Sequence, residues 1–314
     1  MRKKIISMLL VLAVTVTGIG VCSGMTAEQV FAKSSTPYQY LNTDGGGTPR
    51  EKVGKYYIWS TEGSTEKLVC AKSLSGKRKT LKSISAKSNK TFAGALVTNG
   101  STIYYAILDF NTWKTTIYKT NVKGAKSKKI KTVDDRFSSM AGYYNGSVYY
   151  TARASKKNPN AGFNLVSYDI SKKKTRTAKK KFYSNSSYGK YFSGAKGYGG
   201  NYTQYLYNAK TKKTKKLKKA QDSQVSGKKV YYLCEANQKS SIYKVKSSSL
   251  SGKSLKTVKT IKKAAPLYFG KKCAYFVELY DGPYSGDTIT ETILKLNYKT
   301  KKVTKSTREV PLYD

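Results

Sequence analysis

Short apolar runs rich in tyrosine and β-branched residues alternate along the chain with polar turns and lysine-rich stretches. The run STIYYAIL (residues 101–108) shows this pattern most clearly. Its positions 103, 105 and 107 would lie on one face of a strand and positions 104, 106 and 108 on the other, and all six are apolar or tyrosine. A strand with one wet face would alternate with polar residues, so this pattern predicts a strand packed between two sheets.

The same phrase recurs at nearly regular intervals. NGSTIYYA begins at Asn99, and NGSVYYTA begins 46 positions later at Asn145. Six copies align on one glycine, at intervals of 46, 46, 43, 38 and 43 residues. The aligned glycines are Gly54, Gly100, Gly146, Gly189, Gly227 and Gly270. Each copy is followed by a second line such as TIYKTNVKGAKSKKIKTV, so each unit is expected to contain four short strands joined by hairpins.

A four-stranded unit repeated about every 40 to 45 residues is typical of a β-propeller, where each sheet buries its apolar faces against its neighbours. The sequence therefore predicts an all-β fold, a six-bladed β-propeller of four-stranded antiparallel blades over residues 51–314. Helical periodicity is absent from residues 33–314. A flat solenoid of hairpins is the structural alternative, although its two end sheets would need caps.

The IYY strand followed by the IYK strand resembles the YWTD-type propeller of the low-density-lipoprotein-receptor class, and most closely its secreted bacterial relatives. The resemblance covers residues 52–307 and implies the propeller fold. It departs at the defining tetrapeptide, for which YIWS (residues 57–60) is the nearest match and YAIL and YTAR are degenerate. Receptor-like ligand binding is therefore not implied. The WD dipeptide and the Asp-box pattern of other propeller classes are missing.

The first residues carry a basic start followed by an apolar run, and VFA then offers suitable residues for cleavage after Ala32. This pattern predicts a secretory signal peptide over residues 1–32, with no transmembrane span after its removal and a secreted or envelope-associated protein. A retained membrane anchor and lipid attachment at Cys22 are alternatives. Residues 33–50 are expected to be a linker or a closing strand, and residues 308–314 are the other candidate for closing the ring.

The charge is extreme, with 60 lysines and arginines against 17 acids, a formal net charge of +43. Nearly all the basic residues are lysines. A lysine is a hydrated point charge, whereas arginine has the forked donor group that suits recognition of nucleobases. This favours an anionic cell-wall polymer, a glycan or another polyanion as partner over sequence-specific nucleic acid. The alternative is that the lysines only protect sheet edges and keep the chain soluble.

In an antiparallel meander, the first turn and the third-to-fourth hairpin share one face, and we expect most lysine runs there. The polyanion-binding candidates are Lys77, Lys79, Lys126, Lys128, Lys129, Lys172, Lys173, Lys174, Lys212, Lys213, Lys215, Lys216, Lys301 and Lys302. The opposite face is expected to carry the longest loops and to bind a glycan, peptide or protein partner through aromatic side chains. Candidates there are Phe110, Trp113, Tyr198, Tyr202, Tyr280, Tyr284, Asp281 and Asp287. Ordinary packing of the loops against each other is the alternative.

Catalysis is disfavoured because the chain has no histidine, which removes Ser-His-Asp and Cys-His arrangements and imidazole metal ligands. Paired carboxylates are the remaining route, as in glycoside hydrolysis. The candidates for it are Asp134, Asp135, Glu278, Asp281, Asp287 and Glu291. Carboxylates in so basic a chain are more often lysine partners, and no acidic loop has recognised calcium spacing. We therefore predict no catalytic residues, no cofactor and no metal.

Three cysteines follow the predicted signal, and all lie in apolar runs, which indicates buried thiols and no disulfide framework. Taken together, the sequence predicts a non-enzymatic binding or scaffold propeller at the bacterial envelope. Its lysine-rich hairpins would hold it on anionic polymers, and its opposite face would present a ligand or protein site. A carbohydrate-active enzyme that uses paired carboxylates is the alternative function, and a purely structural or sensory subunit is a third.

Overall fold

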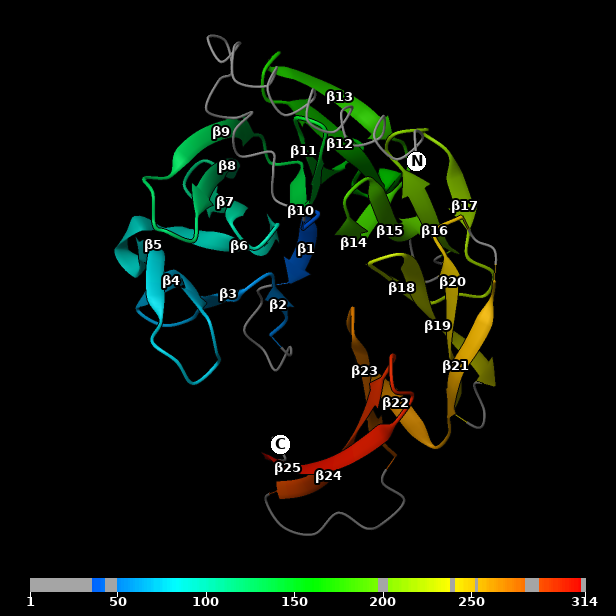
Figure 1. The fold of residues 1–314 in the computed structure, drawn as a ribbon. Coiled ribbons are helices and arrows are strands. Elements are labelled where there is room, and N and C mark those ends of the chain that lie inside the picture. The colour runs from blue at the N-terminus through cyan, green and yellow to red at the C-terminus, as the bar shows by residue number, and fades with distance from the viewer. Residues whose placement is uncertain are drawn as a thin grey trace, which may run out of the picture. The chain divides into compact units, whose positions relative to one another are not determined.

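The structure is a computed structural model that describes residues 36–42, 50–196, 203–237, 241–251, 254–279 and 288–311. Within these ranges the chain forms strands β1 to β25 and two short 3-10 turns, η2 (Ala86–Ser88) and η3 (Pro159–Ala161), without an α-helix (Figure 1). No helix long and apolar enough to cross a membrane occurs in these ranges. The predicted signal peptide and its cleavage site at Ala32 lie outside the described residues.

Strands β2 to β25 form consecutive four-stranded antiparallel meanders, one for each repeat of the sequence. The first meander comprises β2 (Lys52–Val53), β3 (Tyr56–Thr61), β4 (Thr65–Ala71) and β5 (Lys79–Ser85). The second comprises β6 (Lys90–Thr98), β7 (Thr102–Asp109), β8 (Lys114–Asn121) and β9 (Lys128–Val133). The third comprises β10 (Phe137–Tyr144), β11 (Ser147–Arg153), β12 (Phe163–Asp169) and β13 (Lys174–Lys179).

The second half of the chain repeats this arrangement. The fourth meander comprises β14 (Tyr183–Tyr188), β15 (Tyr191–Lys196), β16 (Thr203–Asn208) and β17 (Thr214–Lys216). The fifth comprises β18 (Asp222–Ser226), β19 (Lys229–Asn237), β20 (Ile242–Ser249) and β21 (Lys256–Ile261). The sixth comprises β22 (Ala264–Phe269), β23 (Cys273–Glu278), β24 (Thr288–Asn297) and β25 (Val303–Pro311).

Neighbouring meanders pack face to face. On β7, Ile103 and Tyr105 are buried against the first meander, and Tyr104 and Ala106 are buried against the third. Similar apolar clusters join the third meander to the fourth, the fourth to the fifth and the fifth to the sixth. Each fully buried large side chain contributes about 1.5–3 kcal/mol, so burial between meanders is a major source of stability. This packing confirms the prediction of strands buried on both faces and defines a β-propeller with four-stranded antiparallel blades.

Strand β1 (Gln39–Asn42) lies apart from the meanders in sequence. It pairs antiparallel with β6 along its whole length, and Gln39 also lies opposite Tyr188 of β14. It therefore joins the second and fourth meanders into one nine-stranded sheet (Figure 1). Residues 39–42 belong to the segment expected to be a linker or a closing strand, and they complete the inner edges of two meanders.

The first and last meanders are each built from one continuous segment of the chain. β2 pairs with β3, and β25 pairs with β24 up to Pro311. The expected exchange of a strand between the two ends of the repeat array is therefore not seen in the part of the chain that the structure describes. The inner strand of the first meander, β2, is only two residues long. Strand β1 does not extend it but lies between β6 and β14, the inner strands of the second and fourth meanders.

The repeated glycine is needed where the first turn is tight. Gly100 has a φ of 86°, and a Cβ atom there would lie 2.6 Å from the carbonyl oxygen of Val53. The side chain of Asn99 accepts the backbone N–H groups of Ser101 and Thr102 at 3.1 and 2.8 Å, which closes the turn. The phrase NGS at residues 99–101 therefore both turns the chain and lets the second meander approach the first.

The meanders have two ends. We call the end with the first turns and the third-to-fourth-strand hairpins, including residues 72–78, 122–127, 170–173, 209–213 and 298–302, the hairpin face. The loop face is the end with the second-to-third-strand loops and the links between meanders, including residues 62–64, 110–113, 134–136 and 154–162. All the side chains discussed below belong to one of these two faces or to the strands between them.

Candidate functional site

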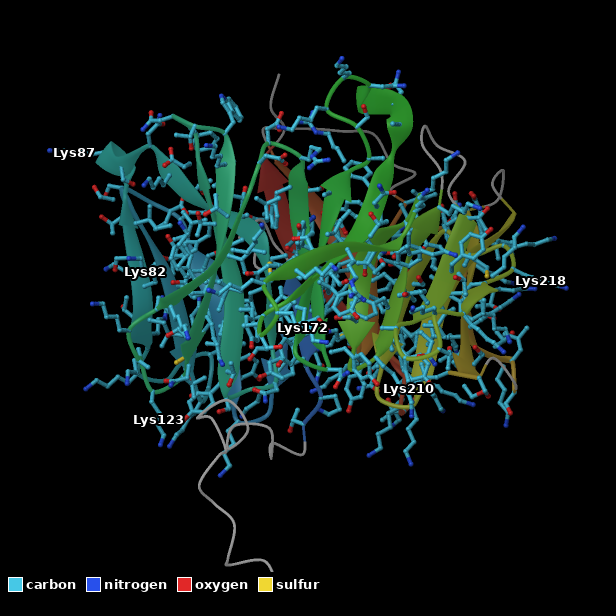
Figure 2. All side chains as sticks on the ribbon, turned by 90° about the horizontal axis from the view of Figure 1, so that it is seen from above. Lys82, Lys87, Lys123, Lys172, Lys210 and Lys218 are labelled. Carbon is cyan, nitrogen blue, oxygen red and sulfur yellow. The ribbon has the colours of Figure 1, made fainter. Side chains whose placement is uncertain are left out.

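The predicted polyanion-binding lysines lie on exposed surface. All fourteen are exposed, and they come from the hairpins or from the first residues of the outer strands. Figure 2 shows Lys123 and Lys210 at the same end of the meanders and Lys87 toward the other end, whereas Lys82 and Lys218 lie on the flanks. These side chains are therefore accessible to solvent, and two groups of them come together around pockets.

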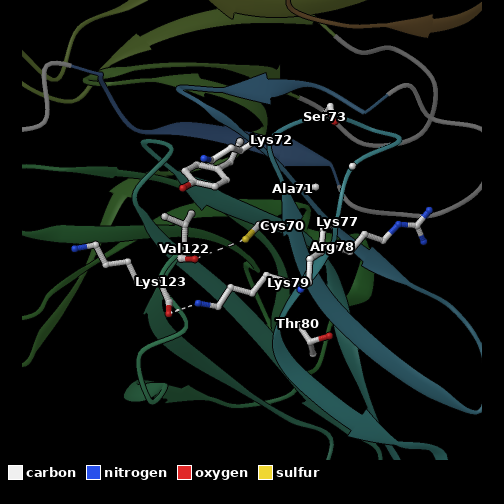
Figure 3. A pocket seen from close by; sticks show the side chains of 12 residues that line it. Cys70, Ala71, Lys72, Ser73, Lys77, Arg78, Lys79, Thr80, Val122 and Lys123 are labelled. Atoms are coloured by element: carbon white, nitrogen blue, oxygen red, sulfur yellow. Dashed lines mark hydrogen bonds between the residues drawn. The ribbon is translucent and has the colours of Figure 1, made fainter.

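The first cluster surrounds a pocket of about 730 Å³ between the first and second meanders (Figure 3). It includes two predicted residues, Lys77 and Lys79, together with Lys123, which is not among the predicted candidates. Lys79 Nζ donates to the backbone carbonyl of Lys123 at 2.5 Å, so this lysine spans the two meanders. The thiol of Cys70 lines the pocket and donates to the carbonyl of Val122 at 3.8 Å; burial raises its pKa, and nearby Lys79 opposes the rise.

A second pocket, of about 630 Å³, occupies the equivalent place between the third and fourth meanders. The basic residues that line it are Lys172, Lys174, Arg176, Lys210 and Lys212. Three of them were predicted; Arg176 and Lys210 lie at the ends of the same basic runs, residues 171–176 and 210–216, but were not among the predicted candidates. Asp169 is the acid in this lining, and its carboxylate accepts the backbone N–H of Lys172 at 3.0 Å and the hydroxyl of Ser171 at 2.8 Å. These two bonds lower the pKa of Asp169.

Acidic side chains are segregated from the hairpins. Among the described residues, the acids other than Asp169 and Glu51 lie in the loop-face half of their strands or in loops of that face. Each carboxylate that forms a described ion pair lies in this half. Within the same ranges, no lysine of the hairpins pairs with a carboxylate. The hairpin face therefore presents positive charge that the described part of the chain does not neutralise.

The carboxylates considered for the alternative, enzymatic function are bound to cations where the structure describes them. Arg136 and Lys156 each bind Asp134 at 3.1 Å, and although burial opposes ionisation, these partners lower the pKa of Asp134 to about 2. Asp135 is paired with Arg153 and with the same lysine, at 3.7 and 3.4 Å. A carboxylate with so low a pKa is a poor proton donor or acceptor near neutral pH.

The last meander shows the same arrangement. Lys305 binds Glu278 at 2.7 Å, and Arg308 binds Glu291 at 2.6 Å. The other two carboxylates of that cluster, Asp281 and Asp287, lie outside the described residues. Over the described ranges, no group of three or more cysteines and acids is placed to hold a metal ion.

The arginines are divided between the two faces. Three of them, Arg136, Arg153 and Arg308, are paired with loop-face acids, as described above. Arg50 and Arg78 instead lie over the ring of Trp59, with guanidinium carbons 4.6 and 5.6 Å from the ring centroid. Trp59 is buried, and its indole N–H has no hydrogen-bond partner in the described structure. The two guanidiniums add to the positive charge beside the first pocket, whose lining includes Arg78.

Two of the predicted aromatic ligand residues are described on the loop face. Phe110 and Trp113 are 37% and 61% exposed, and their rings meet edge to face at 5.7 Å. They form a small exposed aromatic pair on the β7–β8 loop, and their role in binding stays a prediction. The other candidates on this face, Tyr198, Tyr202, Tyr280, Tyr284, Asp281 and Asp287, lie outside the described residues.

The first turn of the sixth meander, between β22 and β23, carries a buried polar group that the sequence analysis missed. Lys271, only 5% exposed, donates from Nζ to the carbonyl of Tyr40 in β1, and its backbone N–H donates to Glu51 at 2.8 Å. Burial lowers the pKa of Lys271 to about 8, and Glu51 opposes this shift. A buried ammonium that donates to a carbonyl of β1 anchors this strand to the sixth meander. The preceding turn glycine gave no signal of this role, because the sequence GKK resembles the other first turns.

No protein-family model matches the sequence, and no curated protein matches it significantly. Among solved structures, the chain is similar to a prolyl endopeptidase studied for interdomain dynamics, with 11% identity and a TM-score of 0.51 over 90% of this chain. It is also similar to TolB from Acinetobacter baumannii, with 15% identity and a TM-score of 0.51 over 88% of this chain. The matches cover 51% of the endopeptidase chain and 65% of the TolB chain.

These similar structures are propeller-type proteins, and at such low identity they show the fold alone. The class of protein defined by the structure is therefore an all-β propeller with four-stranded antiparallel blades. The resemblance to YWTD-type propellers stays a prediction, since no family match tests it.

Proposed function

We propose that the six meanders form the six blades of one propeller, and that this propeller is a non-enzymatic module that binds anionic polymers through its hairpin face. The observation that carries the proposal is the segregation of charge. The hairpin lysines are exposed and have no described carboxylate partner, whereas the described ion pairs use acids of the loop-face half. Two basic pockets in equivalent places between meanders would each accept an anionic group of the polymer.

The setting follows from the predicted signal peptide. Removal of residues 1–32 would release the chain outside the cytoplasm, where anionic cell-wall polymers are abundant ligands for a basic protein. The loop face would remain free to present a ligand or protein site. A function limited to solubility does not require the described acids, other than Asp169 and Glu51, to gather in the loop-face half, because mixed charges keep a surface soluble equally well.

A carbohydrate-active enzyme is the second candidate, and the described carboxylates do not favour it. A retaining or inverting glycosidase needs one carboxyl that is protonated near neutral pH. Asp134 has its pKa held near 2, and Glu278 and Glu291 are each bound to a cation. These acids act as partners of basic side chains in the way expected of a binding protein.

The experiment that tests this proposal measures binding to isolated bacterial cell walls, with and without their anionic polymers, over a salt series. Linear polyphosphate serves as the defined probe and neutral dextran as the uncharged control. Binding should require the anionic polymer and weaken steeply with salt, because counterions are released when lysines contact the chain. Binding that is absent, or that does not respond to salt, would contradict the proposal.

A matched pair of variants assigns the binding to a face. The hairpin-face variant replaces Lys172, Lys174, Lys210 and Lys212 by glutamine, and the control replaces Lys82, Lys87, Lys157 and Lys218, which are also exposed. Both lose four charges. For a flexible polyanion, each lysine contact contributes about −0.7 to the slope of log K against log salt concentration. The hairpin-face variant should therefore reduce the magnitude of this slope by as much as about 3, and the control variant should reduce it by less than about 1. Equal effects would mean that only net charge matters.

A further inference from the structure

A third pocket, of about 350 Å³, lies at the loop-face end of the inner strands. Four aromatic side chains from four different strands line it: Tyr40 of β1, Phe92 of β6, Phe137 of β10 and Tyr183 of β14. The pocket is within the size range of small-ligand sites. It is separate from the hairpin-face pockets and from the predicted aromatic residues of the loops, so the proposed polyanion binding makes no use of it.

Irregular backbone opens the inner strands at this place. The pairing of β6 with β7 shifts register between Phe92 and Leu96, and Gly94 in this bulge has a φ of 47°. β10 has a register shift between Phe137 and Ser139, directly beside the pocket. Bulges of this kind often lie next to binding sites because they redirect side chains away from the regular sheet. Here they turn aromatic side chains into a common space.

The rings that line the pocket are held in place from behind. Phe92 meets Tyr105 edge to face at 5.9 Å, and Phe137 stacks on Tyr150 at 5.8 Å. Tyr183 meets Phe163 edge to face at 5.1 Å. β1, which contributes Tyr40, is anchored by the buried Lys271. The rings are therefore already placed by their own packing before a ligand binds, which reduces the entropic cost of binding.

The lining residues that the structure describes are all uncharged, although the chain carries a net charge of +43. Four hydroxyl side chains, from Thr91, Thr115, Ser138 and Ser139, accompany the aromatic rings. The nearby carboxylate of Glu66 already has partners, since it accepts hydrogen bonds from the hydroxyl of Thr91 at 2.8 Å and from the backbone N–H of Phe92 at 3.0 Å. A charged ligand would find no opposite charge among the described lining residues, and a purely apolar ligand would cover the hydroxyls of Thr115 and Ser138 without giving them a hydrogen bond.

Aromatic faces combined with hydroxyl groups and no charge match the chemistry of a sugar ring, which has apolar C–H faces and a polar edge. We propose that this pocket binds an uncharged sugar ring of a glycan. The propeller then has two binding surfaces of different chemistry. The hairpin face holds anionic groups, and the loop-face end of the inner strands holds a neutral sugar.

The test is isothermal titration calorimetry of the full chain at high salt, which suppresses the binding of polyanions. The probes are neutral oligomers of glucose and of N-acetylglucosamine, an oligomer of uronic acids and a short apolar peptide. Each is titrated up to about 10 mM, which detects a Kd as weak as about 10 mM, a binding free energy of about 3 kcal/mol. A neutral oligomer should bind, and the uronic acid oligomer and the peptide should not. Preference for the peptide or the charged oligomer, or no binding of any neutral oligomer, would overturn the proposal.

Three variants locate the site. Phe137→Leu and Tyr183→Leu keep apolar contacts but remove a ring face, and each should weaken binding at least fivefold, as expected for the loss of about 1 kcal/mol of ring contact. Phe110→Leu is the control, since Phe110 is an aromatic residue on the same face that does not line the pocket. Urea midpoints of all three establish that they are folded. Binding lost in Phe110→Leu and kept in the other two would place the site on the loop instead.

Discussion

Asp222 begins β18 as a buried carboxyl whose charge is poorly compensated. Its Oδ1 accepts Asn185 Nδ2 at 2.8 Å and the backbone N–H of Ser223 at 2.6 Å. Burial nevertheless raises the pKa of Asp222 from 3.8 to about 6, against the effect of these two bonds. Asn185 Oδ1 is also buried, and it has no hydrogen-bond partner in the described structure. The site therefore favours a neutral side chain that can donate a hydrogen bond.

The sign of the pH effect follows from the raised pKa. Between pH 3.8 and 6 the folded chain binds a proton that the unfolded chain has released, so Asp222 lowers the free energy of unfolding as the pH rises through this window. A shift of about two units corresponds to about 3 kcal/mol, nearly all of it lost by pH 7. Asp222→Asn removes the charge, keeps the shape and adds a donor for Asn185 Oδ1. We expect the variant to exceed the parent by about 3 kcal/mol at pH 8 and by less than about 1 kcal/mol at pH 4.

The assay is urea unfolding of both proteins at several values between pH 4 and pH 8, followed by tryptophan fluorescence and circular dichroism. Asp169→Asn is the matched control. Hydrogen bonds lower the pKa of Asp169 below 3.8, so the stability that this carboxylate adds is almost fully present above about pH 5; the variant should be less stable than the parent by a nearly constant amount from about pH 5 to pH 8. Parallel pH profiles for Asp222→Asn and the parent, or a less stable variant at pH 8, would refute the reasoning.

Three further predictions concern the turns, the inner strand and the thiols. Gly100→Ala should cost about 2 kcal/mol more than Gly146→Ala in urea unfolding, because both glycines have a positive φ but only the first would clash with a neighbouring carbonyl. Leu41→Ala should cost about 3 kcal/mol in the same assay, since this β1 side chain is 4% exposed in an apolar cluster; a cost below about 1 kcal/mol would contradict the packing of β1. Burial raises the pKa of the Cys70 and Cys234 thiols, so maleimide labelling at pH 7.5 should be slow until urea unfolds the chain; rapid native labelling would contradict it.

The meanders could be predicted from the sequence because their signals are local. Each repeat contains all of its own signals: the apolar pairs around Tyr104 and Tyr105, the Asn-Gly turns and the lysine hairpins. The recurrence of this unit indicates that each sheet packs on the next. The exposed lysines followed from the same pattern, since hairpins at the end of a meander have no neighbour to cover them.

The inner strand β1 could not be predicted. Its sequence QYLN is short and has no repeated counterpart, and its partners β6 and β14 lie far along the chain. The uncharged pocket could not be predicted from the sequence for a related reason. Phe92, Phe137 and Tyr183 each read as an ordinary core residue, and only the bulged inner strands bring them together with Tyr40. The separation of acids from the hairpins also needed the strand directions, because Asp134 and Lys128 are close in sequence but lie toward opposite faces.

The most direct test of the central claim is a lysine footprint. The full chain is acylated briefly with and without linear polyphosphate, and modified residues are quantified by mass spectrometry. If the hairpin face binds the polymer, Lys172, Lys174, Lys210 and Lys212 will be protected, while Lys87 and Lys218, which are equally exposed, will react as before. Uniform protection of all lysines, or protection of Lys87 and Lys218 alone, would contradict the account.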